Sequence, residues 1–288
     1  HRPDHPRSRL GILIVVGGPQ YRVGSHRQFL LLARKLAESG FAVFRFDLRG
    51  MGDSEGEQIT FEESAPDIAA ACDAFVAEQP HLQGLIMWGL CDAASSILMF
   101  GVNDSRVHGA VLLNPWVRSD ATLASARIAT YYGNRFLSPV FWKKLLSGGV
   151  NVKAALGGFL EDWRKKFSIA KESVEPNRKR MSSEAANTDF RDLMRDGLHS
   201  CELPILLILS GEDLTAAEFV GLTKSDRRWQ DALKRKNVTI RRLEGADHTF
   251  SSAAWRGEVE QWTLDWLNGF STYDRAGGAP VRLADESA

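Results

Sequence analysis

Short apolar runs alternate with amphipathic stretches along the first part of the chain. Residues 10–16 and 41–46 are rich in apolar, β-branched and aromatic side chains and end in glycine, proline or aspartate, which predicts two buried strands. Between them Ser25 and Gln28 have the spacing of a capping box, and apolar residues follow at helical spacing until Gly40. The pattern therefore predicts a strand, a helix and a second strand.

The same alternation continues further along the chain. Thr60 and Glu63 repeat the capping-box spacing before an amphipathic stretch, and residues 84–88 form the next apolar run. A helix is expected directly after Cys91, and residues 107–114 supply another strand. Strands that alternate with helices form parallel sheets with right-handed crossovers. We therefore predict an α/β fold, with a mostly parallel sheet and helices on both of its faces.

The alternation stops after this strand and resumes with an apolar run at residues 204–210. Residues 115–200 contain helical patterns and then a polar stretch, which predicts a helical cap (lid) inserted into an α/β core of residues 1–114 and 201–270. The insertion carries 15 Lys and Arg against 9 Asp and Glu, a bias that a solvated helical face also explains. Residues 271–288 lack periodicity and are interpreted as a C-terminal tail.

The second half of the core follows the same rules. We expect a helix at residues 225–236, a strand at 238–243, and a final helix after His248. Apolar residues of the final helix are spaced four, three and four apart, which is typical of a buried face. They are Trp255, Val259, Trp262 and Trp266.

Composition and charge narrow the classes of partner. The 36 Lys and Arg balance the 36 Asp and Glu, so no overall field favours nucleic acid or an anionic membrane, and no apolar run is long enough for stable membrane insertion. The three cysteines do not indicate a disulfide scaffold, and the start lacks the order of a signal peptide, so a cytoplasmic location is expected. Zinc-ligand spacing and phosphate-binding fingerprints are absent, so we expect no metal or organic cofactor. The oligomeric state stays open, with a dimer as one option.

The run Trp88-Gly89-Leu90-Cys91-Asp92-Ala93-Ala94 carries the strongest chemical signal. It lies between an expected strand and an expected helix and has the form of a nucleophile elbow, in which small residues stand two before and two after the nucleophile. Gly89 and Ala93 meet that requirement around Cys91. The helix N-terminus favours a thiolate there. The alternative interpretation is a small buried thiol at a strand end.

A nucleophile of this kind needs a base and a group that orients the base. His248 lies between the last expected strand and the final helix, and Asp213 follows the strand before it. The chain order Cys91, Asp213, His248 is the order of nucleophile, acid and base in α/β-hydrolases. Glu212 and Glu218 remain alternative acids.

An oxyanion hole needs two preorganised N–H donors, one from the residue after the nucleophile and one from the loop after the first core strand. The Asp92 N–H is expected to supply the first. Because Pro19 has no N–H, the second comes from Gly18 or Gln20, and Gly18 is preferred. An ordinary tight turn is the alternative interpretation of these glycines.

Six residues near the ends of strands are candidate substrate-binding residues. Among them, an arginine could hold a carboxylate or phosphate of the substrate. The candidates are Gln20, Tyr21, Arg22, His26, Trp116 and Arg118, with Arg22 as the expected anion-binding group.

Five segments of the chain resemble the exosortase A system-associated hydrolases of the first type. These segments are residues 16–29, 46–54, 89–95, 114–118 and 210–219. The resemblance covers residues 10–270 and implies an α/β-hydrolase with cysteine at the elbow, similar to the dienelactone hydrolases. It also implies a context of bacterial exopolysaccharide and protein sorting.

The expected function is hydrolysis of an ester or thioester through a thioacyl enzyme, with Cys91 as nucleophile, His248 as base and Asp213 as orienting acid. The expected partner is therefore a small-molecule acyl substrate. Amides are less suited, because a thiolate leaves the tetrahedral intermediate more easily than an amine does. The alternatives are an acyltransferase that acts on a sugar, lipid-linked or amine acceptor, and a non-catalytic binding protein of the same fold.

Overall fold

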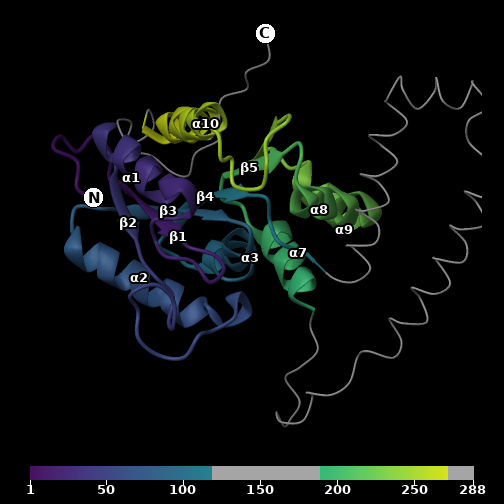
Figure 1. Ribbon diagram of the computed structural model, residues 1–288, viewed down its shortest axis with the longest axis horizontal. Helices are drawn as coiled ribbons and strands as arrows, with labels where there is room; N and C mark the ends of the chain where they lie inside the picture. The colour runs from purple at the N-terminus through teal and green to yellow at the C-terminus, as the bar shows by residue number, and fades with distance from the viewer. Residues whose placement is uncertain (119–188, 272–288) are drawn as a thin grey trace, which may run out of the picture. The chain divides into compact units, whose positions relative to one another are not determined.

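A parallel six-stranded sheet forms the centre of the fold (Figure 1). The computed structural model describes residues 1–118 and 189–271, which all belong to one compact unit. The strand order is β2-β1-β3-β4-β5-β6, and each pair of neighbours is parallel. The predicted α/β fold is therefore confirmed. The strands are β1 (Leu10–Val15), β2 (Ala42–Arg45), β3 (Gly84–Leu90), β4 (Val107–Leu113), β5 (Ile205–Ser210) and β6 (Val238–Leu243).

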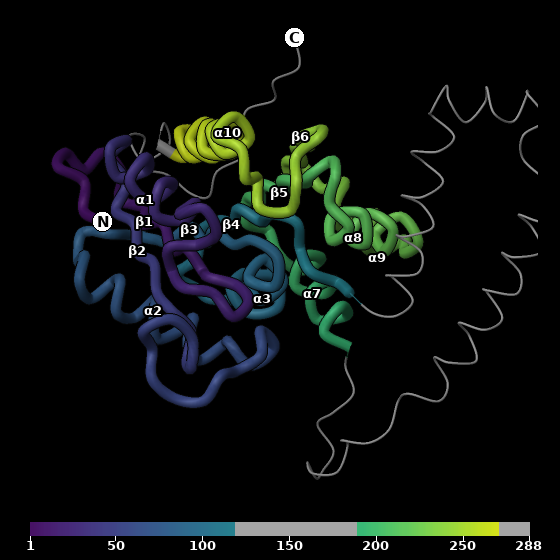
Figure 2. The backbone as a smooth tube through the Cα atoms, viewed as in Figure 1, coloured from purple at the N-terminus to yellow at the C-terminus, as the bar shows by residue number. Residues whose placement is uncertain are grey.

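Helices cover both faces of this sheet, with α1 and α10 on one face and α2 and α3 on the other (Figures 1 and 2). Because strand side chains alternate between faces, Ile14 joins the core that includes Phe29 of α1, whereas Leu13 joins the core that includes Phe75 of α2. The helices of the described residues are η1 (Ser25–Arg27), α1 (Gln28–Glu38), η2 (Phe61–Glu63), α2 (Ala65–Glu78), α3 (Asp92–Met99), η3 (Gly101–Asn103), α7 (Phe190–Ser200), α8 (Leu214–Ser225), α9 (Arg227–Leu233) and α10 (Ala253–Ser271).

The two expected capping boxes have different outcomes. Thr60 and Glu63 form theirs at the start of η2. The prediction for Ser25 is wrong: η1 has no side-chain cap, and α1 begins at Gln28. His26 and Arg27 have φ angles of 53° and 60°, and this left-handed backbone interrupts the helix that the sequence pattern predicts.

The helix that follows β5 begins much earlier than expected. Asp213 accepts hydrogen bonds from the backbone N–H groups of Thr215 and Ala216, and so caps α8. A second helix, α9, then covers part of the predicted range and starts at the Asp226 cap. The apolar residues of α8 lack a clear stripe, which is why periodicity did not reveal it. The predicted apolar face of α10 is confirmed, since Val259 and Trp266 are buried and Trp255 and Trp262 pack beside them.

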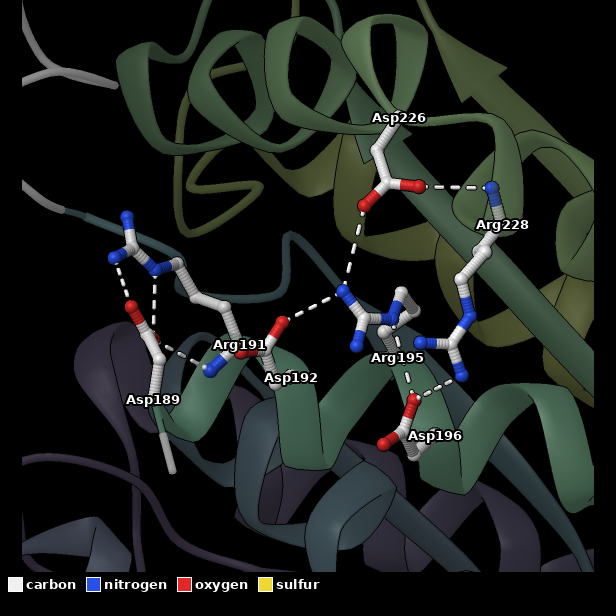
Figure 3. A network of polar contacts seen from close by, with 7 residues as sticks. All are labelled: Asp189, Arg191, Asp192, Arg195, Asp196, Asp226 and Arg228. Atoms are coloured by element: carbon white, nitrogen blue, oxygen red, sulfur yellow. Dashed lines mark hydrogen bonds and ion pairs between the residues drawn. The ribbon is translucent and has the colours of Figure 1, made fainter. Parts of the chain in front are cut away.

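A chain of ion pairs connects α7 to α9 (Figure 3). Arg195 contacts Asp192 and Asp196 on its own helix and Asp226 at the start of α9, while Arg228 reaches back to Asp196 at 2.8 Å. On its other side α7 approaches α3 so closely that a Cβ at Gly197 would lie 1.9 Å from the Leu98 carbonyl oxygen. Residues 190–200, which the sequence analysis assigned to the cap, therefore pack on α3 and α9.

The rest of the predicted cap, residues 119–188, and residues 272–288 of the predicted tail lie outside the described residues. The domain boundaries thus stay a prediction. Among the helices of the described residues, none has the length and apolar character required to cross a membrane.

Candidate active site

Cys91 occupies a sharp turn between β3 and α3. Its φ of 64° and ψ of −126° are unusual for a residue with a side chain, as a nucleophile elbow requires. The backbone holds this turn: Cys91 N–H donates to the Leu113 carbonyl at 2.9 Å, and the Cys91 carbonyl accepts from Trp116 N–H at 3.3 Å. A Cβ at Gly89 would lie 2.7 Å from the Ile97 side chain, so a small residue is required there. The local sequence thus presents a half-buried thiol at the carboxyl edge of the sheet.

Asp213 and His248 are in direct contact at this edge. His248 Nδ1 lies 2.9 Å from Asp213 Oδ2, although 35 residues separate them in the chain. Burial lowers the pKa of His248, but hydrogen bonds and charge from Asp213 and Cys91 outweigh burial and raise the pKa to about 10. Burial raises the pKa of Asp213, but the bond from His248 and two backbone N–H bonds bring it below the ordinary value. With Nδ1 bound to Asp213, Nε2 is the nitrogen that remains for Cys91.

Asn114 and Ser210 hold the loop that carries His248. Asn114, at the end of β4, donates from its amide to the His248 carbonyl at 3.0 Å and to Ser210 Oγ at 2.7 Å, and accepts from Ser210 N–H at 2.8 Å. Ser210 Oγ donates in turn to the Asp247 carbonyl at 2.8 Å. Both side chains are buried. We call Asn114, Ser210, Asp213 and His248 the base side of the site.

The opposite side of Cys91 is built by the glycine turn after β1. Gly18 N–H, the preferred oxyanion donor, donates to Asp92 Oδ2 at 2.7 Å, and Asp92 Oδ1 accepts from Ala93 N–H at 3.0 Å. The side-chain amide of Gln20 donates to the Gly17 carbonyl at 2.9 Å. We call Gly17, Gly18 and Asp92 the oxyanion side. Sequence reasoning used only the backbone of Asp92 and missed its carboxylate.

Tyr21 and Arg22 form a network of their own. The Arg22 guanidinium pairs with the buried carboxylate of Asp47 and, at 2.9 Å, with Asp53, and Tyr21 Oη donates to Asp53 at 2.9 Å. The guanidinium that was expected to bind a substrate anion is thus held by two carboxylates. His26 lies in η1, four residues after Arg22 in the chain.

Trp116 and Arg118 follow β4 on the other side of the elbow. Arg118 lies over the Trp116 ring at 4.4 Å, and its Nε donates to both carboxylate oxygens of Glu218, at 3.2 and 3.1 Å. Glu218 is fully buried. Three acids were candidates for orienting the base, and Asp213 is the one in contact with His248. Glu218 forms an ion pair with Arg118.

Comparisons with known proteins agree with this architecture. The sequence matches a family model described as serine aminopeptidase, S33, over residues 11–252. No curated protein matches the sequence.

Solved structures extend the comparison. An esterase of Pyrococcus furiosus is 18% identical over 91% of this chain and 83% of its own, with a TM-score of 0.57. A monoacylglycerol lipase of Paleococcus ferrophilus is 21% identical over 92% of this chain and 96% of its own, with a TM-score of 0.54. Est1E of Butyrivibrio proteoclasticus, with ferulic acid bound, is 12% identical over 93% of this chain and 94% of its own, with a TM-score of 0.56. At these identities the likenesses show a common fold.

Proposed function

Because the chain belongs to the α/β-hydrolase family described as serine aminopeptidase, S33, we propose that it hydrolyses a carboxylic ester or thioester with Cys91 as the nucleophile. The observation that carries the proposal is the 2.9 Å contact between His248 and Asp213 beside the Cys91 elbow. The raised pKa of His248 supports a protonated imidazole beside Cys91. Cysteine stands here where the description of the family names a serine.

The reaction proceeds in two halves. The Cys91 thiolate attacks the carbonyl carbon, and the carbonyl electron pair moves onto oxygen. When that oxyanion collapses, the bond to the leaving group breaks, and His248 Nε2 gives its proton to the departing alkoxide or thiolate. In the second half His248 takes a proton from water, the resulting hydroxide attacks the thioester, and the thiolate leaves. Asp213 holds the imidazole in one orientation throughout.

An ester or thioester fits this chemistry better than an amide. A thiolate leaves the tetrahedral intermediate more readily than an unprotonated amine, so amide substrates return to starting material unless the amine is protonated first. Five sequence segments resemble the exosortase-associated hydrolases. We therefore propose that the chain is of this type within the family.

Intact-mass spectrometry after brief mixing with short and medium acyl p-nitrophenyl esters tests the proposal. We expect one acyl adduct in the native chain and none in Cys91→Ala. In His248→Ala we expect the rate of acylation to be about 10⁴-fold lower than in the native chain. His81→Ala, which changes an exposed histidine, is the matched control.

Buried thiols provide an internal reference in the same experiment. Burial raises the pKa of Cys72 to about 11 and also raises the pKa of Cys201, so neither is expected to react quickly. Equal iodoacetamide labelling of Cys91 and Cys72, with no acyl adduct, would contradict the proposal. Acyl products that exceed free acid when an alcohol or amine is added would instead establish acyl transfer, which uses the same acyl enzyme.

A further inference from the structure

The carboxylate of Asp92 has no part in the mechanism described above. Asp92 is the first residue of α3, where an acidic side chain ordinarily binds N–H groups of its own helix. One oxygen does so, through Ala93 N–H. The other oxygen accepts a hydrogen bond from outside the helix, from Gly18 N–H, which lies 74 residues earlier in the chain. A single side chain thus joins the elbow to the glycine turn after β1.

The glycine turn is shaped to receive this carboxylate. A Cβ at Gly17 would lie 2.0 Å from Asp92 Oδ1, so the carboxylate rests directly against the glycine backbone. Gly18 has a φ of 63°, which glycine adopts without steric penalty. Close approach at Gly17 and a left-handed turn at Gly18 therefore both depend on glycine.

The carboxylate keeps this position against a desolvation penalty. Burial, the largest influence, raises the pKa of Asp92, while the N–H bonds from Gly18 and Ala93 and the charge of His248 oppose it, and the result lies above the ordinary value. An apolar side chain would avoid that penalty but would leave Gly18 N–H without its acceptor. The two N–H bonds therefore hold the carboxylate in place although burial disfavours its charge.

We propose that Asp92 is a positioning residue, whose carboxylate holds the Gly17–Gly18 turn against the N-terminus of α3 so that the substrate's carbonyl oxygen can be bound there. Because Gly18 N–H is already bound to Asp92, the donor from the turn is the Gln20 side-chain amide. A Cβ at Gly18 would lie 3.7 Å from both Asp92 Oδ2 and Gln20 Nε2. One N–H of Gln20 Nε2 donates to the Gly17 carbonyl. The second N–H of Nε2 is the one that donates to the oxyanion in this proposal.

Two reactions of Cys91 separate this role from the activation of the thiol. With iodoacetamide, the sulfur attacks the CH₂ group, a C–S bond forms and iodide leaves, so no oxyanion arises. Acylation by an ester forms a tetrahedral oxyanion. The inference rests on the proposed function, yet it makes its own claim: Asp92 affects acylation and leaves alkylation unchanged.

The experiment measures both rates in the native chain, Asp92→Ala, Asp92→Asn and Gln20→Ala. Asp104→Asn is the matched control, because Asp104 also accepts hydrogen bonds, from the backbone N–H and the guanidinium of Arg106, but lies before β4, at the opposite edge of the sheet. Acylation by p-nitrophenyl acetate is expected to fall about tenfold to a hundredfold in Asp92→Ala. Asp92→Asn keeps one acceptor oxygen and is expected to fall between native and alanine. Gln20→Ala is expected to lose about tenfold, and alkylation rates are expected to stay within about twofold of native in all three.

Each other outcome overturns the inference. Native acylation in Asp92→Ala removes the positioning role, and faster acylation shows that the carboxylate competes with substrate. Equal losses in alkylation and acylation show general distortion of the elbow. If the native chain is not acylated at all, the proposed function fails, and that result differs from every outcome above.

Discussion

The base side and the oxyanion side flank the same thiol but are built differently. On the base side, Asn114 and Ser210 hold two consecutive backbone carbonyls, and Asp213 independently holds the imidazole. On the oxyanion side, one carboxylate holds the glycine turn. The orientation of His248 is therefore supported from several strands, whereas we propose that the oxyanion geometry depends on Asp92 alone. Removal of one side chain should therefore have different effects on the two sides of the site.

Asn114→Ala is the substitution that tests the base side most severely. It leaves the His248 carbonyl and the Ser210 N–H without their partners in a buried setting, so we expect a loss of about 1–3 kcal/mol in the free energy of unfolding. Alkylation and acylation of Cys91 should fall together, by about tenfold, because the imidazole moves. Urea unfolding and the two rate measurements check this, with the exposed Asn103→Ala as control. A loss confined to acylation would mean that Asn114 does not position the base.

Unfolding measured over a range of pH tests the charge on His248, which belongs to the base side. In the folded protein the pKa of His248 rises from 6.5 to about 10, so the protonated imidazole stabilises the fold fully below about pH 6.5, and this stabilisation is lost as the pH approaches 10. His248→Gln has no such titration. The stability of the native chain relative to this variant should therefore decrease between pH 6.5 and 10 in urea unfolding. A constant difference across that window would be incompatible with a charged His248.

The smallest effect on acylation is expected for Arg22, which belongs to neither the base side nor the oxyanion side. Arg22 is paired with Asp47 and Asp53 and is one-third exposed, so Arg22→Gln should change acylation of neutral esters by about twofold or less. An anionic ester, such as a hemisuccinate, measured in parallel shows whether the paired guanidinium also binds substrate. A selective loss with the anionic ester would restore the role that the sequence predicted for Arg22.

Patterns that repeat along the chain allowed much of the fold to be predicted. All six strands were found, because buried parallel strands are short apolar runs with clear ends. The contact between Asp213 and His248 was also expected, since both residues follow strands whose carboxyl ends share one edge. Local periodicity and strand order are sufficient for both predictions.

Contacts between a side chain and a backbone group far away in the chain could not be predicted from local patterns. Asn114 lies 134 residues from His248, and Asp92 lies 74 residues from Gly18. An asparagine at a strand end and an aspartate at a helix start are both common locally, so neither signals its partner. The backbone at His26 and Arg27 was missed for a related reason, because the spacing of Ser25 and Gln28 does not encode a left-handed conformation.

Residues 118 and 189 are both anchored in the core by side-chain contacts. Arg118 is bound to the buried Glu218 on one side, and Asp189 caps α7, which the ion pairs of Figure 3 and the contact at Gly197 hold on the other. For protein engineering, this makes residues 118 and 189 suitable crossover points for recombination. Segments exchanged between them would join the core at two residues that printed contacts of the core hold in place.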